Sequence, residues 1–289
     1  MTGIASTAHL PRVRARRRGD HEIQLGVSEE QAAILSGLSP AETRAILGLG
    51  PLTALQWGHA TSTKPPSARW DQVVDLLGRA ARGVAQHYAP SGTVVVVGTG
   101  SVADAVTDVL SAISSRVITR PHDVHRLERG EGPVEPVDLV VLPSQDALPP
   151  HLYAGWQRHG IPHLPVVVSA TRLVVGPLVR PGGHGPCLRC LDLHRTARDP
   201  HWPDLVAQLE SSGPRPEDVS TSPELAAMAA GLVGLTARSL LVGRPLPAGV
   251  ALSVASPQPR VQHHAWTPHP ECSCRRVDPA DTHGAAPTT

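Results

Sequence analysis

The stretch GTVVVVGTGSVADAVTDVLSAI, residues 92–113, decides the fold. It opens with a run of valines, turns at glycine, and continues with apolar residues at the three- and four-residue spacing of a helix. An uninterrupted β-branched run is typical of a strand covered on both faces, as in a parallel sheet. The stretch therefore predicts a strand, a tight turn and a helix, which is the repeating unit of an α/β fold.

The turn itself, residues 98–103 (GTGSVA), fits the pattern G-x-G-x-x-A of nucleotide-binding turns. In such a turn the glycines let the backbone approach a phosphate at the positive end of the helix. Gly98, Gly100 and Ser101 are therefore candidate nucleotide-binding residues. The acid that should hold a ribose about twenty residues later is missing, because residues 119–120 are Thr-Arg. A plain strand-to-helix connection explains the turn as well.

Further strands and a core helix follow along the chain. Short apolar runs predict strands in residues 115–120, 137–143, 164–182 and 250–265, the last two ranges each holding two strands around a turn. Residues 222–243 are apolar on nearly all sides and predict a long buried helix. The whole predicts an α/β domain with a sheet covered by helices.

All four cysteines of the chain occur in two close pairs. Cys187 and Cys190 form a C-x-x-C, and Cys272 and Cys274 form a C-x-C. Two pairs with no cysteine left over suit a structural Zn(II) site with four thiolate ligands, which leaves no open position for catalysis. Disulfides and free or redox-active thiols are the alternatives, and bridging within a C-x-C would strain the geometry.

Residues 12–85 have a different pattern from the rest of the chain. Two short extended pieces, residues 12–18 and 22–27, precede three predicted helices in residues 28–38, 39–49 and 67–88. A hairpin with three helices suggests a small winged helix-turn-helix domain. The polar, small residues of 1–11 and 277–289 are typical of disordered termini.

Composition limits the partners. The net charge is +1 with basic and acidic residues interspersed, so the chain carries no strong electrostatic footprint for nucleic acid or a membrane surface. No signal-peptide pattern opens the chain and no window resembles a membrane span. We expect a cytoplasmic protein with small-molecule, peptide or protein partners.

The order of these motifs resembles the ThiF and E1-like adenylyltransferase family over residues 90–276. Residues 176–190 (GPLVRPGGHGPCLRC) carry the resemblance best, together with HPECSC at 269–274. It implies a Rossmann-like mixed sheet with structural zinc, ATP and Mg²⁺ as cofactors, and a homodimer. Residues 12–85 resemble the peptide-recognition element of leader-peptide-binding proteins, and such fusions are similar to the E1-like partners of azole and azoline cyclodehydratases.

The chain departs from the active members of this family. Residues 121–136 are too few for the long crossover that carries their catalytic side chains, and the single lysine, Lys64, precedes the glycine turn. Gln145 stands at the magnesium position, with Asp146 next to it as a further candidate nucleotide-site residue. These departures favour a degenerate, non-catalytic fold.

Three functions follow from these observations. The first is a binding module that takes an extended peptide as an added strand beside residues 22–27 and presents it to a partner, for example a cyclodehydratase-like enzyme. The second is an active ATP-dependent adenylyltransferase. The third is a DNA-binding winged-helix regulator, for which residues 1–50 carry six arginines against five acids.

Overall fold

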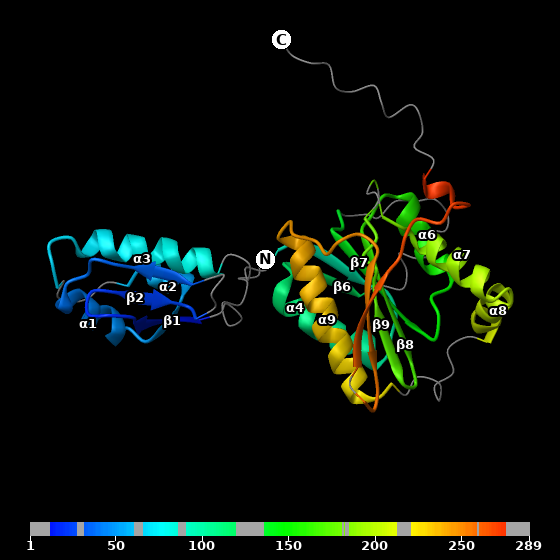
Figure 1. The fold of residues 1–289 in the computed structure, drawn as a ribbon, viewed down its shortest axis with the longest axis horizontal. Helices are drawn as coiled ribbons and strands as arrows, with labels where there is room; N and C mark the ends of the chain where they lie inside the picture. The colour runs from blue at the N-terminus through cyan, green and yellow to red at the C-terminus, as the bar shows by residue number, and fades with distance from the viewer. Residues whose placement is uncertain are drawn as a thin grey trace, which may run out of the picture. The chain divides into compact units, whose positions relative to one another are not determined.

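The computed structural model describes residues 12–27, 32–60, 66–85, 91–119, 136–180, 182, 185–212, 221–258 and 260–275. The chain divides into two compact units, residues 1–90 and 91–289 (Figure 1). The first carries a four-stranded antiparallel sheet and the second a seven-stranded mixed sheet, which confirms the α/β class. The predictions for both termini, for Lys64 and for residues 121–135 fall outside the described residues.

The sheet of the first unit has the order β3-β2-β1-β4. Its strands are β1 (Arg12–Arg17), β2 (Ile23–Leu25), β3 (Ala33–Leu35) and β4 (Pro51–Thr53). In β1 the residues alternate between exposed arginines and the buried Val13 and Ala15. This period of two is what places an alternating sequence on the face of a sheet.

The predicted helix in residues 28–38 is wrong, because β3 lies there. Its residues pair with β2 in antiparallel register, with Ala33 opposite Leu25 and Leu35 opposite Ile23. A short apolar run fits a helix or a strand equally well, and pairing with a neighbouring strand decides between them. The prediction that a partner peptide adds as a strand beside residues 22–27 is also wrong. β2 is paired with β3 on one side and with β1 on the other, so it has no open edge.

Three helices complete the first unit: α1 (Pro40–Gly48), α2 (Ala54–Gly58) and α3 (Trp70–Ala85). Ser39 caps α1, and its hydroxyl accepts from the backbone N–H of Glu42, whose carboxylate accepts from the Ser39 N–H. The winged helix-turn-helix assignment of residues 12–85 stays a prediction.

Glu42 joins the start of α1 to the segment before α3. Its carboxylate is fully buried and accepts from the Arg69 guanidinium at 2.8 and 3.0 Å and from the Ser67 hydroxyl at 2.6 Å. The hydrogen bonds from Arg69 hold the pKa of Glu42 far below its usual range, against the opposing effect of burial. A buried charge with this many partners fixes how the two segments pack.

The sheet of the second unit has the order β11-β10-β9-β8-β7-β5-β6. Its strands are β5 (Thr93–Val96), β6 (Arg116–Thr119), β7 (Leu139–Gln145), β8 (His163–Ser169), β9 (Arg172–Val175), β10 (Val250–Ala255) and β11 (Arg260–Ala265). The strands from β6 to β8 are parallel, and β9, β10 and β11 follow in antiparallel pairs. Each predicted strand region of this unit is confirmed.

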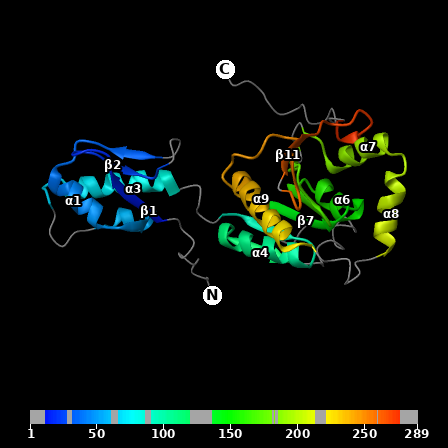
Figure 2. The same ribbon diagram turned by 60° about the horizontal axis from the view of Figure 1, so that its bottom comes forward.

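Helices cover both faces of this sheet (Figures 1 and 2). On one face α4 (Ser101–Ile113) and α9 (Pro223–Leu241) pack together over the sheet's valines and leucines. On the other lie α6 (Pro150–Arg158) and α7 (Leu188–Arg198), and α8 (Trp202–Ser212) packs on α7. By length and composition α9 could cross a membrane. Leu225, Ala229 and Val233 on one side of it are buried in the core, whereas Leu235 is 69% exposed.

Candidate functional site

The four cysteines come together at the end of the last strand. Cys187 caps α7 and Cys190 lies in its first turn, while Cys272 precedes the 3₁₀ turn Ser273–Arg275 after β11 and Cys274 lies within that turn. All four Sγ atoms lie within 4.8 Å of one another. The predicted convergence of the two pairs is therefore confirmed at the level of geometry, and the cluster could hold a metal ion.

The sulfur separations fit a tetrahedral metal. Cys187 Sγ lies 3.8 Å from Cys190 Sγ and 3.6 Å from Cys272 Sγ, and the Sγ atoms of Cys190 and Cys274 are 3.3 Å apart. A Zn–S bond of about 2.3 Å in a tetrahedron places neighbouring sulfurs about 3.8 Å apart. None of the four is joined in a disulfide, so the disulfide alternative finds no support.

The pKa values of three of the four thiols are shifted in the cluster. Burial raises the pKa of Cys187 to about 11 and also raises the pKa of Cys274. The pKa of Cys190 is lowered, because backbone and thiol hydrogen bonds, the first from the His269 backbone, outweigh the effect of its burial. A divalent metal would stabilise all four as thiolates and release their protons on binding.

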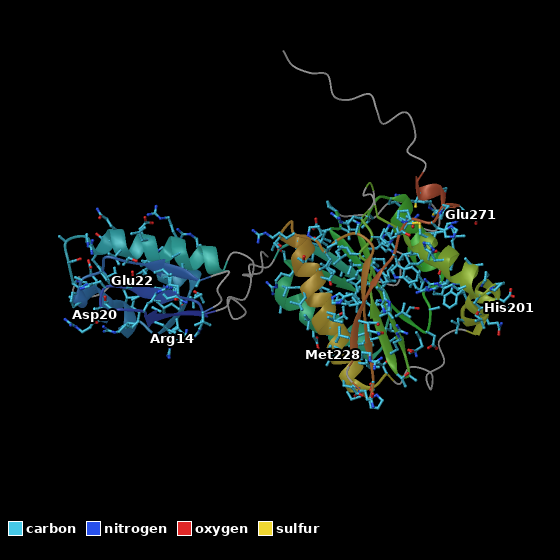
Figure 3. All side chains as sticks on the ribbon, viewed as in Figure 1. Arg14, Asp20, Glu22, His201, Met228 and Glu271 are labelled. Atoms are coloured by element: carbon cyan, nitrogen blue, oxygen red, sulfur yellow. The ribbon has the colours of Figure 1, made fainter. Side chains whose placement is uncertain are left out.

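The two described histidines nearby, His194 and His269, have hydrogen-bond partners outside the cluster, and His184 lies outside the described residues. His194 Nε2 lies 2.9 Å from the carbonyl oxygen of Thr267, and His269 Nδ1 accepts from the Glu271 N–H. The two rings pack edge to face with centroids 4.7 Å apart. The segment that carries Glu271 borders the cluster in Figure 3. These rings support the backbone on which the thiols are mounted.

A polar and aromatic network on α7 was not visible in the sequence pattern. Asp192 accepts from the Tyr153 hydroxyl at 2.9 Å and from the Trp202 ring N–H at 3.3 Å. Arg195 pairs with Asp192 at 3.4 Å, and its guanidinium lies 4.9 Å from the Trp202 ring and 5.9 Å from the Trp266 ring. The network joins α6, α7, α8 and the strand end that leads to the cluster. The Asp-x-x-Arg spacing on one helix face was its only sequence signal.

The glycine turn has the backbone geometry that its sequence predicts. Gly98 and Gly100 have φ angles of 131° and 98°, which other residues adopt only under strain. Gly100 is the N-cap of α4, so Ser101 opens the helix. The order of strands reverses here, because β6 lies on one side of β5 and β7 on the other. Ligands of α/β sheets bind at such a reversal.

The side chains around this turn are less complete than its backbone. Asp146 is exposed after the end of β7, the strand beside β5, and its own φ is 57°. Its N–H donates to the carbonyl oxygen of Val168 at 2.8 Å, which anchors the turn. The segment between β6 and β7, with its arginines, lies outside the described residues. Nucleotide binding by Gly98, Gly100, Ser101 and Asp146 stays a prediction.

The chain is similar to solved structures in its fold. A heterocyclase in complex with substrate and cofactor matches with a TM-score of 0.58 and 17% identity over 92% of this chain and 38% of that chain. The heterocyclase TruD matches at 0.55 and 17%, over 92% and 42%. Escherichia coli MccB with ATP matches at 0.50 and 14%, over 91% and 97%. No family model and no curated protein matches the chain.

These similarities show the fold alone, because the identities are low. The chain spans about two fifths of the length of the two heterocyclases, at 38% and 42%, and nearly the whole length of MccB, at 97%. The neighbours are thus consistent with the expected E1-like resemblance at a coarse level.

Proposed function

We propose that the chain is a non-catalytic, peptide-binding partner in a peptide-modification system. The first unit takes an extended peptide as an added strand, and the second unit, an E1-like fold held by structural zinc, docks a cyclodehydratase-like enzyme that acts on the peptide. Strand addition gives affinity through main-chain hydrogen bonds and specificity through alternate side chains.

The open edge of β3 carries this proposal. Within the described residues β3 pairs with β2 alone, whereas the other edge strand, β4, begins with a proline, Pro51. The edge sequence Ala33-Ile34-Leu35 is apolar, and Ile34 is 47% exposed. An apolar edge strand without charge or proline is a template for another strand. A bound peptide would cover Ile34 and use the free backbone groups of β3.

Zinc is the metal that the donor set favours. Four thiolates in a tetrahedron select Zn(II) among the common divalent ions, and a site without an open position is structural. The metal would fasten the segment after β11 to the start of α7, which steadies one side of the second unit as a docking platform. The similarity to a heterocyclase in complex with substrate supports a peptide-modification setting.

Selection from a random peptide display library on the full chain tests the proposal. Selected peptides should lose binding about fivefold or more in Ile34→Asp, because a carboxylate at a covered apolar position has an uncompensated desolvation cost of about 1–3 kcal/mol. Leu205→Asp is the matched control, since Leu205 on α8 is 46% exposed against 47% for Ile34. Bound peptide should also slow amide hydrogen exchange of residues 33–35.

Two results would contradict the proposal. One is equal loss of binding in Ile34→Asp and Leu205→Asp, which would mean that an added negative charge weakens peptide binding wherever it is placed on the surface. The other is unchanged exchange of residues 33–35 under saturating peptide, which would move the binding surface away from the β3 edge.

ATP-dependent adenylyl transfer is the second candidate, favoured by the glycine turn at the strand-order reversal. Its test is carboxylate-dependent exchange of labelled pyrophosphate into ATP over a broad panel of peptides and carboxylic acids. Exchange that Gly100→Val abolishes would favour the enzyme. Absence of exchange with every substrate on the panel favours the binding partner.

A further inference from the structure

A cavity of about 440 Å³ opens on the second unit, away from the cysteine cluster and from the glycine turn. It lies where β9 begins, β10 ends and β11 begins, so it shares the sheet edge at which β5, β7 and β8 end. The lining residues with polar side chains include Thr171, Arg172, Ser253, Gln258, Arg260 and Gln262. Its size falls within the range of ligand sites.

Two arginines line this cavity, one on each side of an alanine on the strand between them. Arg172 on β9 pairs with Ala255 on β10, and Ala255 pairs in turn with Arg260 on β11. Directly paired residues of antiparallel strands place their side chains on the same face. The two guanidinium side chains therefore rise from backbones about 10 Å apart, two strand spacings, with only a methyl group between them.

Arg172 is held in place by a buried hydroxyl and an imidazole. Its Nη2 lies 3.3 Å from Ser253 Oγ and 3.3 Å from His264 Nε2, and these two acceptors are 2.8 Å apart. Ser253 is 2% exposed. Burial and the charge of Arg172 lower the pKa of His264, which favours a neutral ring. Nη1 and Nε of Arg172 have no partner among these groups.

The charge around the cavity is positive. No carboxylate lines it, and neither Arg172 nor Arg260 forms an ion pair within the part of the chain that the structure describes. Glu224 stands beside it and accepts from Ser256 at 3.2 Å. Unpaired guanidiniums over a cavity of this size are suited to planar, bidentate recognition of an anion.

We propose that this cavity binds the carboxylates of an acidic peptide segment. Two separated guanidiniums fit two carboxylates of an extended chain, and the amides of Gln258 and Gln262 can pair with peptide backbone groups. The site lies in the second unit and does not depend on strand addition at β3. It would supply a second, electrostatic contact for the peptide.

Fluorescence anisotropy with the full chain tests this site directly. The probe is the labelled peptide GSEGEGEGS, compared with GSQGQGQGS and with inorganic phosphate as a competitor, at about 0.1 M salt so that weak surface attraction is screened. Arg260→Gln should weaken binding of the glutamate peptide about tenfold or more. Arg260 does not touch the Ser253 and His264 pair, so this variant leaves the bracing of Arg172 in place.

Two control variants complete the design. Arg244→Gln removes the same charge from an exposed position after α9 and should change affinity less than about twofold. Ile34→Asp should leave binding of the glutamate peptide unchanged, which separates this site from the proposed peptide strand at β3.

Three outcomes overturn the inference. They are glutamine-peptide binding as tight as glutamate-peptide binding, an equal loss in Arg244→Gln, and, in a separate calorimetric titration, saturable phosphate binding by a chain that shows no anisotropy change with the glutamate peptide. The last would identify the ligand as a small free anion.

Discussion

The cysteine cluster and the glycine turn lie in the same unit, but they differ in what the fold builds around them. At the cluster, thiols 84 and 85 positions apart in the chain meet with sulfur separations of 3.3 to 3.6 Å. At the turn, Gly98 and Gly100 supply backbone geometry, and the described side chain on the neighbouring strand, Asp146, is exposed. The cluster is a complete set of metal donors, whereas the described residues at the turn supply backbone geometry and one exposed carboxylate.

This difference separates a site formed by converging side chains from a turn formed by backbone conformation. Four converging thiols with no disulfide among them are a donor set that suits a metal ion. A glycine turn between a strand and a helix has a structural use of its own, which is to let the chain reverse tightly. Side-chain convergence therefore supports a chemical role more strongly than backbone conformation does.

Removing a thiol should give the largest effect. Cys272→Ser leaves three ligands, so zinc content should fall from one equivalent to near zero, and the free energy of unfolding of the second unit should drop by about 5 kcal/mol or more. Metal analysis and thermal unfolding followed by circular dichroism measure both. His194→Ala is the control, and it should keep its zinc. Full zinc retention in Cys272→Ser would contradict the claim that the four cysteines are the ligands of one zinc ion.

Glu42→Gln tests a second side-chain network, in the first unit. Loss of the charged hydrogen bonds from Arg69 and Ser67 should lower the free energy of unfolding of that unit by about 2–3 kcal/mol at neutral pH. Because the pKa of Glu42 is lowered on folding from 4.5, its contribution is full above that value and is lost as the pH falls below it. The variant should show a flatter decline in stability below about pH 4.5.

Denaturant unfolding across pH, with hydrogen exchange of α1, measures the effect of Glu42→Gln. Asp75→Asn is its control, since the Asp75–Arg79 pair is exposed and worth less than about 0.5 kcal/mol. An equal effect of the two variants would mean that burial of Glu42 contributes nothing beyond a surface pair.

Gly100→Ala should give the smallest change in stability. At a φ of 98° a side chain is strained, so the free energy of unfolding should fall by about 1–2 kcal/mol. Thermal unfolding measures it, with Gly231→Ala on the exposed face of α9, where an added methyl meets nothing within 4 Å, as the control. An unstrained, fully stable Gly100→Ala would show that the turn does not need glycine.

Much of the second unit follows from its sequence, because long apolar runs and an apolar helix leave few alternatives. The helix α6 was missed, since its buried Tyr153 and Trp156 show the helical spacing over barely two turns between prolines and a glycine. The first unit was harder to predict. Its strands β3 and β4 are three residues long and take their conformation from pairing, which a local pattern does not contain.

The site residues also divide into those that the sequence predicted and those that it could not. The cysteine spacing predicted four ligands and the fold brings them together. The arginine pair over Ala255 depends on the register of three strands, which no single segment encodes. The network around Asp192 depends on residues from α6, α7 and α8 and was likewise out of reach.

Calorimetric titration of Mg-ATP into zinc-loaded protein tests the central claim most directly. The claim is that this chain has the fold and a structural metal site but does not bind ATP. We predict no saturable heat up to millimolar ATP, for the natural protein and for Gly100→Val alike. Saturable binding that Gly100→Val abolishes would contradict the claim, because the turn would then be a working nucleotide site and the chain a candidate adenylyltransferase.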